Sequence, residues 1–590
     1  MGGVPRDEPG QAAVRRHCIL PFVVAPSEAG PSGGAPKEIP VSFVVRRSLP
    51  SLFGLVGLLI AAGFAAVGFL GAPLWFPVAF AVFMMLVQYA VNPRLIQWLV
   101  PAVPVLCDGE RYDTDHPVGE IVARRCREAG VPLVRLGIVD DGNPNAFTFG
   151  RTPRDARMWV TRGLLERLDE RELDAVITHE VGHVKNWDFA VMTVAAVIPM
   201  TLYLVYLSAR SSNRGEARAV ALGTYLAYLA SQFVLLSLSR AREYAADHYS
   251  CACTGDGDAL ASALVKVAYG MGQANAEHKE QVAALVAEGK EGKKAARRLE
   301  ARMRRARSMQ AMGIFEPSAA EAMAYAFDHG VDPGRAVAAM RWDSVNPWAS
   351  LLEKLSSHPL VVHRIKALEE AGLPGAPQRF SVLRAMTGLD QHQIADARAR
   401  FGRELTLGLA PYAVLVPLVA FGAFTGSALS IGIALAAAGA CFVAKQHLRY
   451  PAGATPVDDV TSLLERLDAG PMGGIPVEIR GRIIGRGFPG YVLSPDLVLQ
   501  DASGFVPLRY RQPVPFLASL FGLFQAKAFI GQDVVAQGWY RRGPGPVVEL
   551  RRVTAADGRH ARCYTSTARH AAAWLLVIAG VLTAVAGLAG

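Results

Sequence analysis

The chain has 590 residues, 51% of them hydrophobic, and a formal net charge of +10. Its mean hydropathy of +0.24 argues against a purely soluble protein, so membrane-spanning segments are expected. The seven cysteines are odd in number and contain no C-x-x-C pair, which favours neither a disulfide framework nor a thiolate metal site. The densest basic run, Lys293–Arg307, contains no aromatic residue and is typical of a solvated helix face near anionic lipid rather than of nucleic-acid binding.

Residues 1–47 predict a flexible tail. Pro, Gly and charged residues dominate it, and it lacks the apolar core and small-residue cleavage site of a secretory signal peptide. Beyond it are uncharged stretches that are each long enough to cross a bilayer as a helix, for which about 20 residues suffice. They are Ser48–Pro93, Phe189–Ala209, Ala219–Ser239, Leu405–Ala444 and Ala571–Gly590.

Two of these stretches are long enough for two crossings. The first has a Gly-Ala-Pro sequence at residues 71–73, and the fourth has Gly426 and Ser427 near its middle. A tight uncharged turn at each place predicts transmembrane hairpins at residues 48–93 and 405–444, and about seven spans in all. The two shorter middle stretches are also compatible with helices that are only partly inserted.

Positive charges predict the orientation in the membrane. Two arginines at 46–47 precede the first predicted hairpin and Arg94 follows it, whereas its turn is uncharged. By the positive-inside rule the N-terminus and the segment after Arg94 are predicted to be cytoplasmic. Three arginines between residues 210 and 218 do not fit a simple alternation of sides.

A soluble part is predicted within residues 94–404, which also include the two middle apolar stretches. Helical periodicity at Val118–Ala129 and Glu170–Lys185 brackets strand-like segments at Val134–Val139 and Met158–Thr161. Residues between the fourth span and the second hairpin are predicted to be almost entirely helical.

Residues 450–568 have a different character. Their alternating and β-branched runs, separated by Gly, Pro and Asp, predict a small β-barrel or sandwich. The glycines at 485, 487 and 490 match G-x-G-x-x-G, but no helix follows to hold a pyrophosphate, so we interpret them as turn residues. The apolar stretch Pro513–Ala526 is too short to span and predicts an interfacial hairpin. The predicted fold class is a mainly α integral membrane protein with a small C-terminal all-β domain and a last span at 571–590.

The segment LDAVITHEVGHVKNWD contains the motif H-E-x-x-H, formed by His179, Glu180 and His183. At 3.6 residues per turn the two histidines lie on one side of a helix, so both can reach one zinc ion. Glu180 lies beside them, where it can act as a general base without being a ligand. An apolar stripe would bury this helix, and it consists of Leu173, Val176, Ile177 and Val184. A chance match would instead leave the histidines as ordinary core or surface residues.

A catalytic zinc requires a third protein ligand, for which Glu243 is the candidate. Asp247 lies four residues later on the same face of a helix, where it can accept the N–H of a liganding histidine. The alternative is a surface ion-pair network with Arg240 and its neighbours. His248 is a rival ligand, although it points away from the face of Glu243.

Four motifs occur in order: N-A-F at Asn145, Ala146 and Phe147; H-E-x-x-H; R-x-x-E-x-x-x-D from Arg240 to Asp247; and S-H-P-x4-R, with His358 and Arg364. This set resembles the HtpX and CAAX prenyl endopeptidase superfamily of membrane zinc metalloproteases, from about Ser48 to Leu373. The resemblance implies that Asn145, Ala146 and Phe147 lie on an edge strand along the substrate. The spans at 405–444, the β-rich part and the last span have no counterpart in the usual core of that family.

The motifs predict a zinc metalloendopeptidase with one Zn²⁺ per chain. Glu180 takes the proton of the attacking water and returns it to the leaving amine. Zinc, with Arg364 or His358, would stabilise the oxyanion. His358 has two further readings, as a fourth ligand that blocks the zinc or as a helix cap, and Arg364 can instead pair with Glu369 or another carboxylate.

Polypeptides and the lipid bilayer are the predicted partners, and nucleic acid is not. Because the site lies between spans, membrane or misfolded proteins are the favoured substrates, with prenylated CAAX peptides as the alternative. The alternative outside the enzymes is a non-catalytic membrane scaffold that acts through the β-rich part. The composition, rich in Ala, Arg and Gly, is typical of a bacterial protein, for which we expect the inner membrane. The positive-inside rule predicts that the catalytic part faces the cytoplasm.

Overall fold

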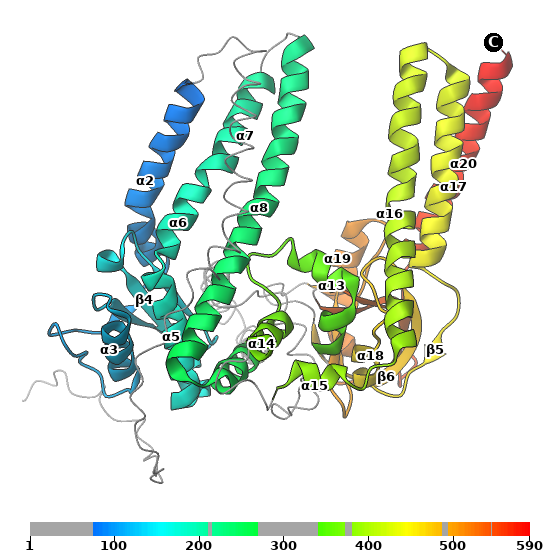
Figure 1. Ribbon diagram of the computed structural model, residues 1–590. Helices are drawn as coiled ribbons and strands as arrows, with labels where there is room; N and C mark the ends of the chain where they lie inside the picture. The colour runs from blue at the N-terminus through cyan, green and yellow to red at the C-terminus, as the bar shows by residue number, and fades with distance from the viewer. Residues whose placement is uncertain are drawn as a thin grey trace, which may run out of the picture. The chain divides into compact units, whose positions relative to one another are not determined.

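The computed structural model describes residues 75–210, 215–268, 340–371, 380–486, 494–543 and 545–589. Within them the protein is mainly helical, with five candidate membrane-spanning helices and a β-barrel near the C-terminal end (Figure 1). Four predictions lie outside the described residues: the N-terminal tail, the first half of the first hairpin, the run Lys293–Arg307, and the glycines at 487 and 490.

Each of the five candidate spans coincides with a stretch predicted to cross the membrane. The helices are α6 (Asp188–Ala195) with α7 (Val197–Arg210), α8 (Gly215–Thr254), α16 (Gln391–Thr425), α17 (Ala428–Arg449) and α20 (Thr565–Ala589). A further apolar helix, α2 (Trp75–Leu99), covers the second half of the first predicted hairpin.

The predicted turn of the second hairpin is confirmed. Gly426 ends α16 in the left-handed region, at φ 67°, where a residue with a Cβ atom would be strained. Ser427 then caps α17, because its side chain accepts a hydrogen bond from the Ser430 N–H. Two consecutive residues therefore end one helix and start the next.

Helix α8 continues well beyond its apolar part. Its 40 residues extend about 60 Å at 1.5 Å per residue, about twice the thickness of the hydrocarbon core. After the apolar part, charged residues begin at Arg240, and the helix continues without a break through Glu243 and Asp247. In the apolar half a row of tyrosines joins α7 to α8, formed by Tyr203, Tyr206, Tyr225 and Tyr228.

Helices α16, α17 and α20 lie side by side (Figure 1). Small residues allow the backbones of α17 and α20 to touch, as is common between membrane helices. A Cβ added at Gly432 would lie 2.2 Å from the Ala584 nitrogen, and one at Gly580 would lie 2.2 Å from the Ala436 nitrogen. Neither position leaves room for a side chain.

A four-stranded sheet covers the helix that carries the H-E-x-x-H motif. Its strand order is β1-β2-β4-β3, so β3 (Ala146–Phe149) is an edge strand. Strands β2 and β4 are parallel, whereas β1 with β2 and β3 with β4 are antiparallel. The other strands are β1 (Val103–Pro104), β2 (Arg135–Val139) and β4 (Arg157–Thr161), and the accompanying helices are α3 (Val118–Ala129), η1 (Pro153–Asp155), α4 (Arg162–Arg167) and α5 (Glu170–Lys185). The bounds of α3 and α5 are those predicted from helical periodicity.

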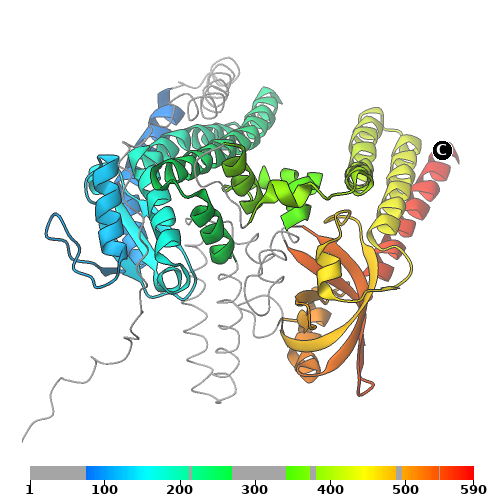
Figure 2. The same ribbon diagram turned by 60° about the horizontal axis from the view of Figure 1, so that its bottom comes forward.

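The β-rich part forms a closed ring of five strands in the order β6-β7-β8-β10-β9, with β9 returning to pair with β6 (Figure 2). Strands β8 and β10 are parallel, and the other pairs in the ring are antiparallel. The elements are β5 (Thr455–Pro456), α18 (Val460–Leu464), β6 (Ile475–Arg486), β7 (Leu497–Gln500), β8 (Phe505–Arg509), α19 (Pro515–Phe524), η2 (Ala526–Phe529), β9 (Asp533–Arg542), β10 (Pro546–Ala555) and β11 (His560–Arg562). Closure leaves the ring without a free edge.

Two local predictions are wrong. Gly485 is not in a turn but inside β6, next to a β-bulge where the pairing with β7 shifts, which is a common place for glycine in a strand. The stretch Pro513–Ala526 contains the single helix α19 where a hairpin was predicted. Leu and Ala are strong helix formers, and Gly522 does not interrupt the helix.

Candidate metal centre and catalytic site

Helix α5 presents the H-E-x-x-H motif inside the protein. It begins with a capping box, in which Asp169 accepts from the Glu172 N–H and the Glu172 side chain accepts from the Asp169 N–H. From Glu172 onward nearly every side chain is buried, including His179 and Glu180. The apolar stripe predicted from the sequence therefore does bury this helix.

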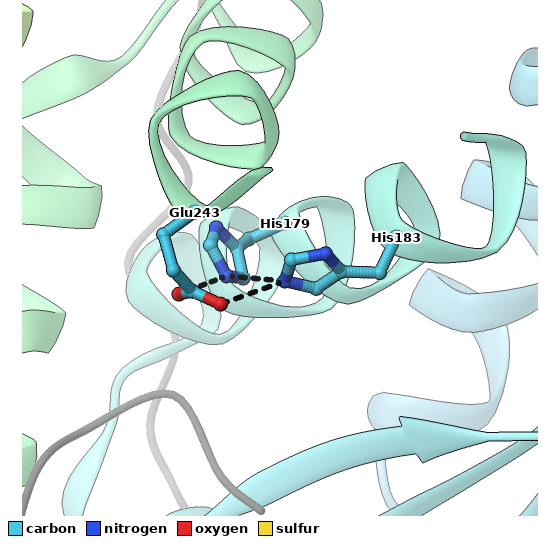
Figure 3. A group of neighbouring side chains, drawn as sticks. All are labelled: His179, His183 and Glu243. Atoms are coloured by element: carbon cyan, nitrogen blue, oxygen red, sulfur yellow. Dashed lines mark hydrogen bonds and ion pairs between the residues drawn. The ribbon is translucent and has the colours of Figure 1, made fainter. Parts of the chain in front are cut away.

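The two histidines and Glu243 converge (Figure 3). The Nε2 atoms of His179 and His183 lie 3.1 Å apart. The Glu243 carboxylate from α8 lies 3.7 Å from His179 Nε2 and 3.6 Å from His183 Nε2. This is the one group of three or more potential ligands found among the described residues, and His248 is outside it.

A carboxylate lies beside the other nitrogen of each imidazole. Asp247 Oδ1 lies 3.0 Å from His179 Nδ1, and Asp188 Oδ2 lies 2.5 Å from His183 Nδ1. A proton held on each Nδ1 by its carboxylate leaves the Nε2 lone pair of both rings facing the centre. The three groups offer two nitrogens and one oxygen, which is a donor set that zinc favours.

The carboxylate of Glu243 fits a metal ligand in a second respect. Its Oε2 atom is buried and makes no hydrogen bond to any described residue. Burial alone would lower the pKa of His179, but the carboxylates of Asp247 and Glu243 raise it to about 9. A buried site that attracts a proton so strongly is suited to hold a cation in its place.

Asp188 was not identified from the sequence. It begins α6, two residues after the C-cap of α5, and the chain turns at Trp187, which has a positive φ of 56°. Its second oxygen lies 3.0 Å from Arg242 Nε. The sequence shows an aspartate five residues after His183, the second histidine of the motif. Only the turn at Trp187 brings this aspartate next to the His183 ring.

Arg364 lies beside Asp247 and Glu243. It is fully buried on α14 (Val361–Glu370) and donates from Nε and Nη2 to the two oxygens of Asp247, at 2.7 and 2.5 Å. Its Nη1 atom lies 3.6 Å from Glu243 Oε2. Burial opposes the charge, but Asp247 raises the pKa of Arg364 above its usual value. The alternative that Arg364 pairs with a carboxylate is therefore confirmed, and that carboxylate belongs to Asp247 rather than to Glu369.

His358 approaches the ligands from the loop before α14. Its Nδ1 atom lies 3.3 Å from Glu243 Oε2. The N-cap of α14 is Leu360, and no side chain caps it, so the reading of His358 as a helix cap is wrong. Arg240 holds this loop, because its Nη1 donates to the carbonyl oxygens of Glu353, Lys354 and Ser356.

The edge strand β3 brings a further residue to Glu180. Thr148 donates from Oγ1 to Glu180 Oε2 at 3.0 Å. Asn145, Ala146 and Phe147 are buried as whole residues, whereas Thr148 is half-buried. Ala146 and Phe147 therefore lie on an edge strand, with Asn145 just before it, and Thr148, one residue beyond the motif, makes the contact with Glu180.

The sequence profile of Peptidase family M48 matches residues 113–372, which contain every residue of the site. The "Protease HtpX homolog" of Methanothermobacter thermautotrophicus is 37% identical over 217 residues, which are 37% of this chain and 81% of the relative. That of Pyrococcus furiosus is 34% identical over 236 residues, 38% of this chain and 78% of the relative. The chain belongs to peptidase family M48. It is an HtpX-like membrane metalloprotease, as the motifs predicted.

Among solved structures, Ste24p of S. mikatae has 17% sequence identity and a TM-score of 0.26, over 38% of this chain and 58% of that one. Residues after 372, with α16, α17, the barrel and α20, lie outside the part of this M48 peptidase that matches the family.

Replacing the carboxylate that holds His183 should weaken metal binding. For Asp188→Asn we expect the affinity for Zn²⁺ to fall about 10- to 100-fold, because the imidazole loses the charged partner that orients it. Competition with a metal indicator dye measures this. Asp256→Asn, which removes a carboxylate paired with Arg171 at a more exposed place, is the control and should bind as the unaltered protein does. Equal affinities in all three proteins would contradict the role of Asp188.

Proposed function

We propose that this protein is a zinc-dependent endopeptidase whose ligands are His179, His183 and Glu243 and whose general base is Glu180. The observation that carries the proposal is the convergence of two imidazole Nε2 atoms and a buried carboxylate, with the other nitrogen of each ring held by a second carboxylate. Such a site is costly to bury without a cation.

The residues around the ion have distinct tasks. Zinc, when bound, supplies Lewis-acid activation of a water molecule and of the scissile carbonyl. Glu180 takes the proton of the attacking water and later delivers it to the leaving amine. Since Thr148 donates to Oε2 of Glu180, the carboxylate is held in one orientation and Oε1 is the oxygen that exchanges the proton.

We propose that an extended substrate pairs with β3, the edge strand of the four-stranded sheet. The Asn145 carbonyl accepts from the Thr161 N–H, so alternation along an antiparallel pair points the backbone groups of Ala146 and Thr148 away from β4. A peptide that pairs with this edge would run beside Glu180. Recognition through the backbone makes few demands on side chains, which supports broad sequence specificity.

Arg364 and His358 differ in what they can reach. Arg364 is occupied by Asp247 on two of its nitrogens, so we assign it a positioning role for Asp247 and through it for His179. His358 points its Nδ1 toward the ligands and remains the candidate for the oxyanion, or for a fourth ligand that yields to substrate.

Glu180→Gln should keep about one equivalent of zinc and lose peptide hydrolysis, because it removes the base but no ligand. Glu243→Gln is the matched substitution on the other carboxylate, and it should lose metal together with activity. Metal content by atomic emission and digestion of an unfolded membrane protein are the two measurements. Zinc loss in Glu180→Gln would show that Glu180 is a ligand. Full zinc retention in Glu243→Gln would show that Glu243 is not one.

The change in kcat of His358→Ala distinguishes the two tasks proposed for His358, because the two predict changes in opposite directions. If His358 supports the oxyanion, kcat should fall by about 10²- to 10³-fold with metal content unchanged. If it blocks the ion until substrate arrives, kcat should stay equal or rise. His363→Ala is the control, because His363 pairs with Glu353 outside the site. A loss of metal in His358→Ala would instead make His358 a permanent ligand.

We further propose that membrane or misfolded proteins are the substrates. The support is α8, in which a candidate membrane span and the ligand Glu243 belong to one continuous helix, so that the site is next to the bilayer. In the digestion assay above, cleavage of prenylated peptides in preference to unfolded membrane proteins would contradict this assignment.

The catalytic part is proposed to face the cytoplasm of a bacterial cell. Lys445 and Arg449 lie at the end of α17 and Arg569 near the start of α20, whereas the α16–α17 turn is uncharged. Reporters fused after Asn92 and after Pro456 should therefore behave as cytoplasmic, and one after Gly590 as external. Arg210 and Arg218 lie on the side that this orientation makes external, against the positive-inside rule. The reporter after Asn92 therefore tests the orientation of the catalytic part most directly. An external signal there would reverse the orientation of the catalytic part.

A further inference from the structure

Helix α19 is apolar on all sides. It connects β8 to η2, and its sequence PFLASLFGLF contains no charged residue. One face packs on the barrel, where Ala518, Phe521 and Gly522 are buried and the Phe521 ring stacks on Tyr510 at 3.9 Å between centroids. A helix without a polar face is normally buried on every side.

The opposite face of α19 is exposed. Phe516 is 66% and Phe524 72% exposed, and Leu517 and Leu523 are each nearly half exposed. These residues recur at i, i+1, i+7 and i+8, so they form one stripe along the helix. No described residue covers the stripe, and a contiguous apolar surface of this kind marks a contact with a protein or with lipid.

Hydrogen bonds place the approach to α19 beside the entry of a membrane span. Gln512 Nε2 donates to the Arg562 carbonyl at 2.7 Å, and its Oε1 accepts from the Tyr564 N–H at 3.3 Å. Tyr564 is the residue before α20, which is the most apolar of the five candidate spans. The start of α19 is therefore tied to the point where the chain enters the bilayer.

Exposed basic residues lie next to α19 in the chain and at the start of the neighbouring span. Arg511 and Lys527 flank α19 in the chain, and both are exposed. Arg562 is also exposed and lies over the ring of Tyr564, 5.4 Å from its centroid. Arginine, lysine and tyrosine around an apolar patch are typical of the boundary between headgroups and acyl chains, where anionic lipids attract the cations.

We infer that α19 is an interfacial membrane anchor of the barrel. Its exposed stripe inserts about 5–10 Å into the boundary of an anionic leaflet, and Arg511, Lys527 and Arg562 contact lipid phosphates. Lipid is favoured over a protein partner because the stripe offers no polar group that would specify one, and because the helix is tied to a span. The barrel is thereby attached to the bilayer by α19 as well as by the spans at its two ends. This anchor is independent of the catalytic site.

Photolabelling of the full-length protein in vesicles tests the anchor. The vesicles contain phosphatidylethanolamine, phosphatidylglycerol and a phospholipid with a diazirine in its acyl chain. Trypsin cleaves after Arg511 and Lys527, so the peptide Gln512–Lys527 contains all of α19. We expect this peptide to be labelled as the α20 peptide His570–Gly590 is, and far above the polar peptide Val553–Arg559. Labelling at the level of Val553–Arg559 would overturn the proposal, and crosslinks to another peptide would identify a protein occupant instead.

A pair of variants and a change of lipid complete the test. The double substitution Phe516→Glu with Phe524→Glu should reduce labelling of the α19 peptide to the background of Val553–Arg559, while His570–Gly590 stays labelled. Leu106→Glu, at an equally exposed leucine of the protease part, is the control and should leave the α19 peptide unchanged. Replacing phosphatidylglycerol by phosphatidylcholine removes the net negative charge of the leaflet and should lower labelling of the α19 peptide several-fold; equal labelling in both lipids would overturn the attraction of the basic residues to an anionic leaflet.

Discussion

The pairing of each metal-facing histidine with a buried carboxylate is the constraint on which the site depends. Asp247 and Asp188 face the Nδ1 atoms of His179 and His183, and each carboxylate is in turn paired with an arginine. Two carboxylates with no cation beside them would be expensive to bury, and Arg364 and Arg242 offset that cost. The arginines thereby stabilise the carboxylates, which orient the rings, so that the Nε2 atoms face Glu243.

Helix α8 supplies most of this arrangement from one rigid element. Arg242, Glu243 and Asp247 all lie on its extramembrane half and reach, respectively, Asp188, the metal-facing centre and His179. Because the same helix continues through a candidate span, the positions of these three side chains relative to the bilayer are linked. Arg240, one turn before Glu243, extends the network to the loop that carries His358.

The segment before that loop is in contact with residues outside the M48 match. Trp342 donates to the Ala469 carbonyl, and Asn346 donates to the Leu467 carbonyl, both at 2.7 Å. Trp348, on α13 (Pro347–Glu353), donates to Glu404 of α16 at 2.9 Å. The last turn of α13 is then held by Arg240. Parts of the chain that lie outside the M48 match are therefore joined by buried hydrogen bonds to the segment that leads into the site.

Local sequence determined the elements and the core of the site. The capped amphipathic helix of His179 and His183, the strands of the barrel and the Gly426–Ser427 turn all rest on short-range rules of periodicity, capping and backbone freedom, and they appear where those rules place them. Only the tertiary structure brought Asp188 to His183, Arg364 to Asp247 and Thr148 to Glu180. The first contact depends on the turn between two helices, and the other two join elements far apart in the sequence. Periodicity predicts which side chains share one face of a single helix or strand, so it cannot predict contacts between different elements.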